Sequence, residues 1–218
     1  MINTIVFDFD GVLVESTEVK TQAYIKLFKH EKSHLRESIL NYHIKNMGIS
    51  RFQKVQTIYK NILRRPLSDK DLSSICKKFS DIVLDSIVAS PWVEGAHTFI
   101  QENIEKYIFF IVSGTPQDEL KKILEHRKCK DYFCEALGSP KTKEILLHEL
   151  MKKYQIQPNE LVYVGDTETD WNAARTVGIP FIWRRISSET QSLASFSGPT
   201  ISSLVCLQNC LDKINSTE

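Results

Sequence analysis

Hydrophobic and polar positions alternate along this chain with two different periods. Short runs rich in Val, Ile and Phe are typical of strands buried on both faces, and they predict strands at residues 4–9, 107–112, 133–137, 161–164 and 181–183. In other segments apolar residues recur three and four positions apart, which predicts helices at residues 96–105, 117–126, 143–154 and 170–177. Strands that alternate with helices in this way indicate an α/β fold, with a parallel sheet covered by helices.

Turn and cap residues support several of these boundaries. Thr115 followed by Pro116 predicts a helix start, with a hydroxyl cap and with proline at the first helical position. Gly178 and Pro180 predict a helix end before the last strand. The serine-rich residues 187–198 predict a surface loop.

The 75 residues from 16 to 90 interrupt the alternation, because they contain no convincing strand. Apolar residues recur there at helical spacing, for example Tyr24 and Phe28 at positions four apart. We therefore predict an α/β core, residues 1–15 and 91–218, with an inserted all-helical domain at residues 16–90. The connections between the two would lie at residues 16–19 and 91–95.

Charged residues nearly cancel, with 28 Lys and Arg against 27 Asp and Glu and a net charge of +1. This balance offers no overall basic surface for nucleic acid or an anionic membrane. No apolar run approaches the ~20 residues that a membrane span needs, and Met1 stands directly before the first strand without an apolar leader. The five cysteines lack a paired spacing and indicate reduced thiols. We expect a cytoplasmic protein with a small-molecule partner.

Acidic residues follow two of the predicted strands. Asp8 and Asp10 lie at the end of the first strand, where side chains two positions apart point the same way. Asp166 and Asp170 follow the strand at residues 161–164. Because the carboxyl ends of parallel strands share one edge of a sheet, these carboxylates would converge. Buried carboxylates need a compensating cation, and a set of oxygen ligands alone suits Mg²⁺.

A hydroxyl, backbone amides and lysines follow the other strands at the same edge. Ser113 and Gly114, in the stretch IVSGT, precede a helix whose N–H groups favour an anion. Lys141 and Lys143 lie around the next helix start, where a cation opposes the helix dipole and therefore indicates a functional demand. Each feature alone also occurs as a turn or a helix cap, but together they predict a site for an anion and a hard cation.

The sequence resembles the haloacid dehalogenase superfamily over nearly its whole length. The matching stretches are DFDGVLVES, VSGT, Lys143 in GSPKTK, and GDTETDWNAARTVGIP, in the family's order and spacing. Within the superfamily the chain is similar to the phosphoglycolate phosphatase and beta-phosphoglucomutase type. The resemblance implies a Rossmann-like parallel sheet with the first strand central, and a mobile helical cap at residues 16–90. The founding dehalogenases lack the second aspartate of the first motif, so Asp10 argues against dehalogenation.

The resemblance also implies the chemistry of a Mg²⁺-dependent phosphatase. Asp8 would be the nucleophile that forms an aspartyl phosphate, and Asp10 would protonate the leaving alcohol and later take a proton from water. The Asp8 carboxylate, the Asp10 backbone carbonyl and Asp166 would hold Mg²⁺, with Asp170 as a supporting residue. The substrate would be a small phosphorylated metabolite.

The phosphate would be bound by residues of the second and third motifs. Ser113 and the amide of Gly114 would hold phosphoryl oxygens, and a lysine would stabilise both Asp8 and the charge of the transferred group. Lys143 fits the way this part of the family reads, and Lys141 is the alternative.

The predicted cap carries candidates for substrate selection. His43 and Arg51 flank Gly48 in a turn between two helices, where the guanidinium could meet a second anionic group of the substrate. A solvated Arg51 and a surface His43 are the alternative interpretation. Three other functions stay open: a phosphosugar mutase on the same core, a phospho-receiver domain, and a non-catalytic interaction protein. The identity of the phosphate ester and the oligomeric state are not determined by the sequence.

Overall fold

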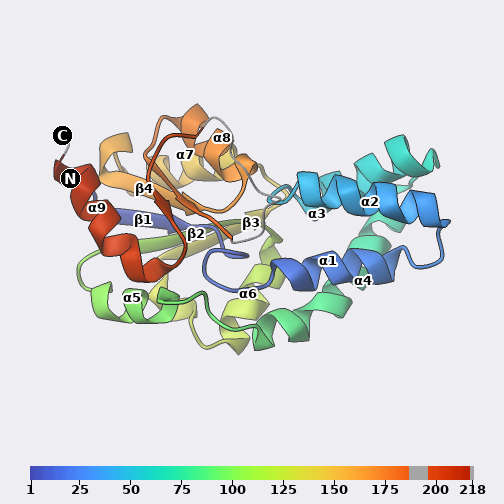
Figure 1. Cartoon of the computed structure of the whole chain (residues 1–218), viewed down its shortest axis with the longest axis horizontal. Coiled ribbons are helices and arrows are strands. Elements are labelled where there is room, and N and C mark those ends of the chain that lie inside the picture. Colours follow the sequence, from blue (N-terminus) through green and yellow to red (C-terminus); the bar gives the residue numbers. More distant parts are fainter. Residues whose placement is uncertain (187–195, 217–218) are drawn as a thin grey trace.

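A parallel sheet of six strands forms the centre of the computed structural model, which describes residues 1–186 and 196–216 (Figure 1). The strands lie in the order β3-β2-β1-β4-β5-β6, and every neighbouring pair is parallel. The predicted α/β fold is therefore confirmed, with β1 between β2 and β4. In chain order the strands are β1 (Thr4–Phe7), β2 (Ile108–Pro116), β3 (Glu135–Ser139), β4 (Leu161–Gly165), β5 (Phe181–Arg184) and β6 (Thr200–Ile201).

Helices cover both faces of the sheet because successive β1 side chains point to opposite sides. Ile5 and Phe7 belong to one apolar cluster together with side chains of α5, α6 and α9, whereas Val6 belongs to a second cluster with side chains of α7 and α8. Figure 1 shows α7 and α8 on one side of the sheet and α5 and α6 on the other. These helices are α5 (Ala96–Asn103), α6 (Gln117–His126), α7 (Lys143–Tyr154), α8 (Glu168–Val177) and α9 (Leu207–Ser216).

Several predicted boundaries differ from the observed ones at the ends of strands. β1 ends at Phe7, so Asp8 follows the strand directly. β2 continues to Pro116, and α6 begins at Gln117 without a side-chain cap, so the prediction of Pro116 as a first helical residue is wrong. The short strand β6 was not predicted, because two residues carry no periodicity. The predicted serine-rich loop at residues 187–198 lies mostly outside the described residues.

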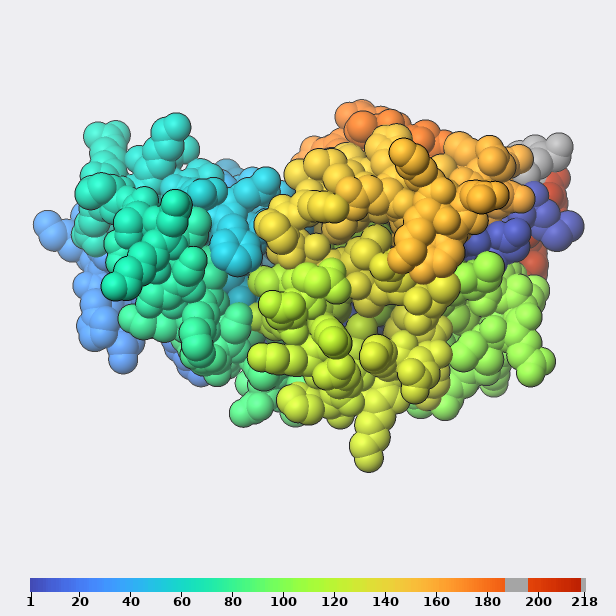
Figure 2. Space-filling view, turned by 180° about the vertical axis from the view of Figure 1, so that it is seen from behind, coloured from blue at the N-terminus to red at the C-terminus, as the bar shows by residue number. Residues whose placement is uncertain are grey.

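Residues 16–90 contain only helices and the turns between them. They are α1 (Thr17–Leu27), α2 (Ser33–Lys45), α3 (Arg51–Thr57), a π-helical turn (Ile58–Leu63) and α4 (Asp69–Ala89). Figures 1 and 2 show these helices as a lobe beside the sheet. None of the described helices combines the length and the hydropathy that crossing a bilayer requires.

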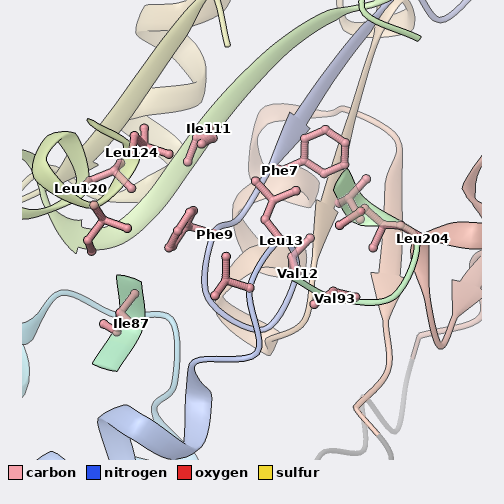
Figure 3. Close-up of a cluster of buried hydrophobic side chains, with 14 of the residues drawn as sticks. Phe7, Phe9, Val12, Leu13, Ile87, Val93, Ile111, Leu120, Leu124 and Leu204 are labelled. Atoms are coloured by element: carbon pink, nitrogen blue, oxygen red, sulfur yellow. The ribbon is translucent and has the colours of Figure 1, made fainter. Parts of the chain in front are cut away.

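The chain passes between this lobe and the sheet twice, and the two connections are hydrogen-bonded to each other. The amide of Glu15 donates to the Pro91 carbonyl at 3.0 Å, and the amide of Val93 donates to the Leu13 carbonyl at 2.9 Å. Ile87, near the end of α4, belongs to the same apolar cluster as Leu120 of α6, as Figure 3 illustrates. The lobe and the sheet therefore share part of one hydrophobic core.

Candidate active site

Asp8 lies at the carboxyl end of the central strand and is 3% exposed. Its Oδ1 accepts the amide of Phe9 at 2.7 Å, and its Oδ2 lies 2.9 Å from Lys143 Nζ. Burial raises the pKa of Asp8 to about 7, although the nearby Lys143 opposes this shift. An ionised Asp8 therefore needs more positive charge than one lysine supplies.

Lys143 begins α7 and is buried between two carboxylates. Its Nζ lies 2.9 Å from Asp8 Oδ2 and 2.5 Å from Asp170 Oδ1. Burial alone would lower the pKa of Lys143, but Asp170 and Asp8 raise it above its ordinary value, so the ammonium stays charged. Lys141 pairs instead with Glu149 on the surface at 2.8 Å. The structure thus places Lys143, and not Lys141, beside Asp8.

Asp170 holds this lysine in position. Its Oδ1 also accepts the Tyr163 hydroxyl at 2.5 Å, and its Oδ2 accepts the Thr167 amide at 3.0 Å and the Thr167 hydroxyl at 2.5 Å. Thr167 and Asp170 form a capping box, so α8 begins two residues before the predicted start. Both Asp170 oxygens are therefore occupied, which suits a residue that orients Lys143.

Asp166 follows β4 and, unlike Asp170, has carboxylate oxygens that are not occupied by hydrogen bonds from the described residues. Both of its carboxylate oxygens are buried and have no hydrogen-bond partner among the described residues. Ligand oxygens of Asp8, Asp166 and Asp170 lie within 4.8 Å of one another. Burial, followed by repulsion from Asp8 and Asp170, raises the pKa of Asp166 well above its ordinary value. A buried carboxylate without partners in an all-oxygen set fits a hard cation such as Mg²⁺.

Asp10 lines the same cavity but has its own partners. Its Oδ1 accepts the Ser16 hydroxyl at 2.6 Å, its Oδ2 accepts the Thr115 hydroxyl at 2.9 Å, and Lys20 of α1 forms an ion pair with it. Although burial alone would raise the pKa of Asp10, Lys20 and these hydrogen bonds hold it below its ordinary value. Asp10 is therefore kept ionised by a residue of the helical lobe.

The site opens onto a small cavity of about 60 Å³ between the sheet and the lobe. Ser113 and Gly114 line this cavity opposite the loop between α2 and α3. This loop approaches the core closely. A Cβ at Gly48 would lie 2.5 Å from Thr167 Oγ1, and one at Gly114 would lie 2.5 Å from the Gly48 carbonyl oxygen. Thr169 donates to the Met47 carbonyl at 3.1 Å. The lobe thus covers the carboxyl ends of the strands.

His43 and Arg51 both line this cavity, but neither is in the turn itself. His43 lies in the last turn of α2 and is 2% exposed, and Arg51 begins α3 and is 5% exposed. The Arg51 guanidinium donates to both oxygens of Glu119 on α6, each at 2.8 Å. The alternative of surface side chains is wrong for both residues. Arg51 therefore forms a contact between the lobe and the core.

The cavity residues that were not singled out from the sequence include Lys20, Lys54 and Thr115 as a partner of Asp10. Lys20 lies in the first turn of α1, and Lys54 follows Arg51 by three positions on α3, so only Lys54 lies about one turn from a candidate residue. Lysines at helical spacing are ordinarily solvated, and this makes the signal weak. Their burial depends on how the lobe meets the sheet.

Comparison with known proteins identifies the family of this chain. The model of the haloacid dehalogenase-like hydrolase family matches residues 5–184. The chain therefore belongs to this family, and the resemblance in the motifs is confirmed.

Curated relatives include two phosphoglycolate phosphatases. That of Vibrio vulnificus is 36% identical over 73 residues, which cover 31% of this chain and 32% of the relative. That of Vibrio parahaemolyticus is 26% identical over 120 residues, which cover 50% of this chain and 53% of the relative. The chain thus spans about a third to about half the length of the curated relatives it matches.

Solved structures share the fold over nearly the whole chain. A predicted phosphoglycolate phosphatase from Haemophilus somnus has a TM-score of 0.76 at 17% identity and covers 96% of this chain and 98% of its own. CbbY from Rhodobacter sphaeroides in complex with phosphate has a TM-score of 0.75 at 14% identity, with 97% and 100% covered. YfnB from Bacillus subtilis, bound to magnesium, has a TM-score of 0.71 at 14% identity, with 97% and 99% covered.

Proposed function

We propose that this protein is a Mg²⁺-dependent phosphatase that hydrolyses a small phosphomonoester through an aspartyl phosphate on Asp8. The observation that carries the proposal is the pairing of Asp8 with the buried Lys143 beside Asp166, whose carboxylate has no partner among the described residues. Family membership supports the same reaction class. The phosphoglycolate phosphatases among the relatives make a phosphoglycolate-like or sugar phosphate the first substrates to consider.

The reaction would proceed in two steps, the transfer of the phosphoryl group to Asp8 and the hydrolysis of the aspartyl phosphate. The Asp8 carboxylate attacks phosphorus and the bond from phosphorus to the ester oxygen breaks, while Asp10 gives a proton to the leaving alcohol. Water then attacks the aspartyl phosphate, Asp10 takes a proton from that water, and the bond between phosphorus and Asp8 breaks to release inorganic phosphate. A phosphate dianion beside Asp10 raises its pKa for the first step, and Lys20 keeps it ionised for the second.

The other site residues would position and screen the phosphate. Asp8, Asp166 and the backbone carbonyl of Asp10 would hold Mg²⁺, which supplies positive charge that lets an anionic nucleophile approach an anionic substrate. Lys143, oriented by Asp170, would stabilise charge on the transferred group. Ser113 and the Gly114 amide would bind phosphoryl oxygens.

The helical lobe, residues 16–90, would act as a cap over an α/β core of residues 1–15 and 91–218. Residues of α1, α2 and α3 line the cavity together with Asp8, so closure of the cap would exclude water and bring selecting residues to the substrate. Lys20 contributes directly, because it reaches from α1 to Asp10 and to the Thr115 hydroxyl.

The test is a phosphatase assay over a panel of small phosphate esters with Mg²⁺. We expect hydrolysis that is lost in excess EDTA after bound metal is removed and restored by Mg²⁺, and that is abolished in Asp8→Asn with the fold intact by circular dichroism. Full activity without divalent cations would contradict the proposal. If a hexose phosphate is isomerised without release of inorganic phosphate, the protein is instead the mutase that the sequence left open.

A further inference from the structure

Among the described residues Lys54 has no carboxylate partner, although it is buried and lines the active-site cavity. It lies on α3, is 5% exposed and lines the same cavity as Asp8 and Asp10. Among the described residues its Nζ makes one hydrogen bond, to His43 Nδ1 at 3.1 Å. A charged ammonium has three donors, so two remain for a bound group.

A chain of hydrogen bonds fixes this lysine. Because a protonated Lys54 can only donate, His43 Nδ1 accepts and His43 is neutral with its proton on Nε2. Nε2 then donates to Thr21 Oγ1 at 3.2 Å, and that hydroxyl donates to the Thr17 carbonyl at 3.1 Å. Tyr24 packs against the imidazole, with ring centroids 4.3 Å apart. Burial, and then the charges of Lys54 and Lys20, lower the pKa of His43 to about 2, which agrees with a neutral ring.

The other cations of the cavity each contact an acid of the protein. Lys20 pairs with Asp10 and Arg51 pairs with Glu119. Lys143, which contacts Asp8 but does not line the cavity, pairs with Asp8 and Asp170. Burying a cation without a counter-charge is costly, and burial lowers the pKa of Lys54 to about 7. Proteins keep such an unfavourable buried charge at sites where a ligand supplies the opposite charge.

We propose that Lys54, held by His43, binds a second anionic group of the substrate and makes the enzyme selective for phosphomonoesters that carry a carboxylate close to the phosphate. This inference rests on the proposed phosphatase function. Lys54 is the specificity-determining residue, and His43 and Thr21 are positioning residues. A carboxylate needs less room than a second phosphate, which agrees with the small cavity of about 60 Å³ that Lys54 shares with Asp8 and Asp10.

The first test compares phosphoglycolate with hydroxyethyl phosphate, which has similar size but a neutral hydroxyl in place of the carboxylate. We expect the wild type to prefer phosphoglycolate in kcat/KM by at least tenfold, about 1.4 kcal/mol. Lys54→Met should remove that preference, and Lys54→Arg should restore part of it. Lys141→Met is the matched control: this lysine is exposed and pairs with Glu149, so the preference should be unchanged.

The second test measures binding without turnover. In an Asp8→Asn background, calorimetric titration with Mg²⁺ present should give a Kd for phosphoglycolate that Lys54→Met weakens at least tenfold, with a much smaller change for hydroxyethyl phosphate. The fold of each variant is checked by circular dichroism. His43→Gln, which keeps a hydrogen-bonding group, should raise KM for phosphoglycolate more than it lowers kcat.

The outcomes separate this inference from the function on which it rests. If the wild type hydrolyses neither ester nor any other in the panel, the proposed function fails. If it hydrolyses hydroxyethyl phosphate as well as phosphoglycolate, the phosphatase stands and the role of Lys54 is refuted. An equal loss on both esters in Lys54→Met would show that Lys54 supports the structure of the cap instead of selecting substrates.

Discussion

Lys141 and Lys143 lie two residues apart, and their different burial gives them different roles at the candidate site. Lys143 is 3% exposed and contacts two carboxylates, whereas the side chain of Lys141 is 54% exposed and its pairing with Glu149 is screened by water. A charge in a dry site acts strongly on a phosphoryl group, and a solvated one hardly does. From the sequence both lysines were expected around a helix start, and Lys143 was favoured only because GSPKTK before an apolar helix resembles this part of the family.

We therefore predict that Lys143→Ala lowers kcat at least a hundredfold, while Lys141→Ala changes it less than twofold. Loss of Lys143 leaves Asp8 and Asp170 facing each other without a cation between them, so the variant should also bind phosphate more weakly. Steady-state kinetics with the best ester of the panel gives the result. Equal effects of the two substitutions would remove Lys143 from the mechanism.

A second prediction at this scale concerns the pH dependence of selectivity. The pKa of Lys54 is lowered to about 7 by burial and then by Lys20 and Arg51, with Asp10 opposing and Lys143 adding to the shift. Lys54 is thus protonated below about pH 7 and loses its charge above it. The ratio of kcat/KM for phosphoglycolate to that for hydroxyethyl phosphate should fall as pH rises through this range.

Taking the ratio cancels the titrations of Asp8 and Asp10, because kcat/KM reports the same free enzyme in each case. The second phosphate pKa of each ester is measured separately and its titration is divided out. Lys54→Arg should give a ratio that does not change with pH, since arginine stays charged. A wild-type ratio that is flat from pH 6 to pH 9 would contradict the assignment of the selecting charge to Lys54.

At the scale of elements, the loop between α2 and α3 can approach the core closely because Gly48 has no side chain. Gly48 has φ +87°, in the left-handed region, and its missing Cβ makes room for Thr167. Gly178 at the end of α8 has a similar φ of +77°, but a Cβ there would meet nothing within 4 Å. The two glycines therefore carry similar backbone strain when substituted, and only one of them lies in the contact between cap and core.

We predict that Gly48→Ala and Gly178→Ala both lower the free energy of unfolding by about 1–2 kcal/mol through left-handed strain. Only Gly48→Ala should also lower kcat/KM, at least tenfold and in the same proportion for all esters, because the displaced loop prevents closure. Denaturant unfolding and kinetics on both variants provide the comparison. Normal activity in Gly48→Ala would mean that the loop does not need to approach Thr167.

The sequence predicted elements better than it predicted the contacts between them. The helices at residues 117–126 and 143–154 agree with α6 and α7 residue for residue, because their apolar faces are long and periodic. Arg51 was placed near the site, but its pairing with Glu119, 68 positions away, depends on how α3 meets α6. Lys20 and Lys54 were missed for the same reason. The four aspartates could be predicted because the ends of neighbouring strands bring them together independently of the helical lobe: Asp8, Asp10, Asp166 and Asp170.

At the scale of the whole molecule, one arginine adds to the contacts between the helical lobe and the core, close to the two paired connections. Arg127, directly after α6, donates to the carbonyls of Ile87, Val88 and Ser90 at 3.2, 2.8 and 2.7 Å. These carbonyls lie at the end of α4 and directly after it, where a cation interacts favourably with the helix dipole. The guanidinium also lies 4.7 Å from the Trp92 ring in the return connection. Arg127 thus attaches the end of α4 to the core beside the return connection.

We predict that Arg127→Met weakens this attachment and shifts the cap toward an open arrangement. Charge-assisted hydrogen bonds contribute about 1.5–3 kcal/mol each, so the melting temperature should fall. Because the proposed mechanism requires closure of the lobe, kcat/KM should fall about tenfold and equally for phosphoglycolate and hydroxyethyl phosphate, in contrast to the selective loss expected for Lys54→Met. Small-angle X-ray scattering should give a larger radius of gyration than for the wild type.

Arg175→Met is the matched control for this prediction, since Arg175 also lies over a tryptophan ring, at 5.0 Å from that of Trp171, but on the exposed surface of α8. It should leave kcat/KM and the radius of gyration unchanged. A lower melting temperature in Arg127→Met with unaltered kinetics and scattering would show that Arg127 stabilises the end of α4 and that cap closure is set by the paired connections alone.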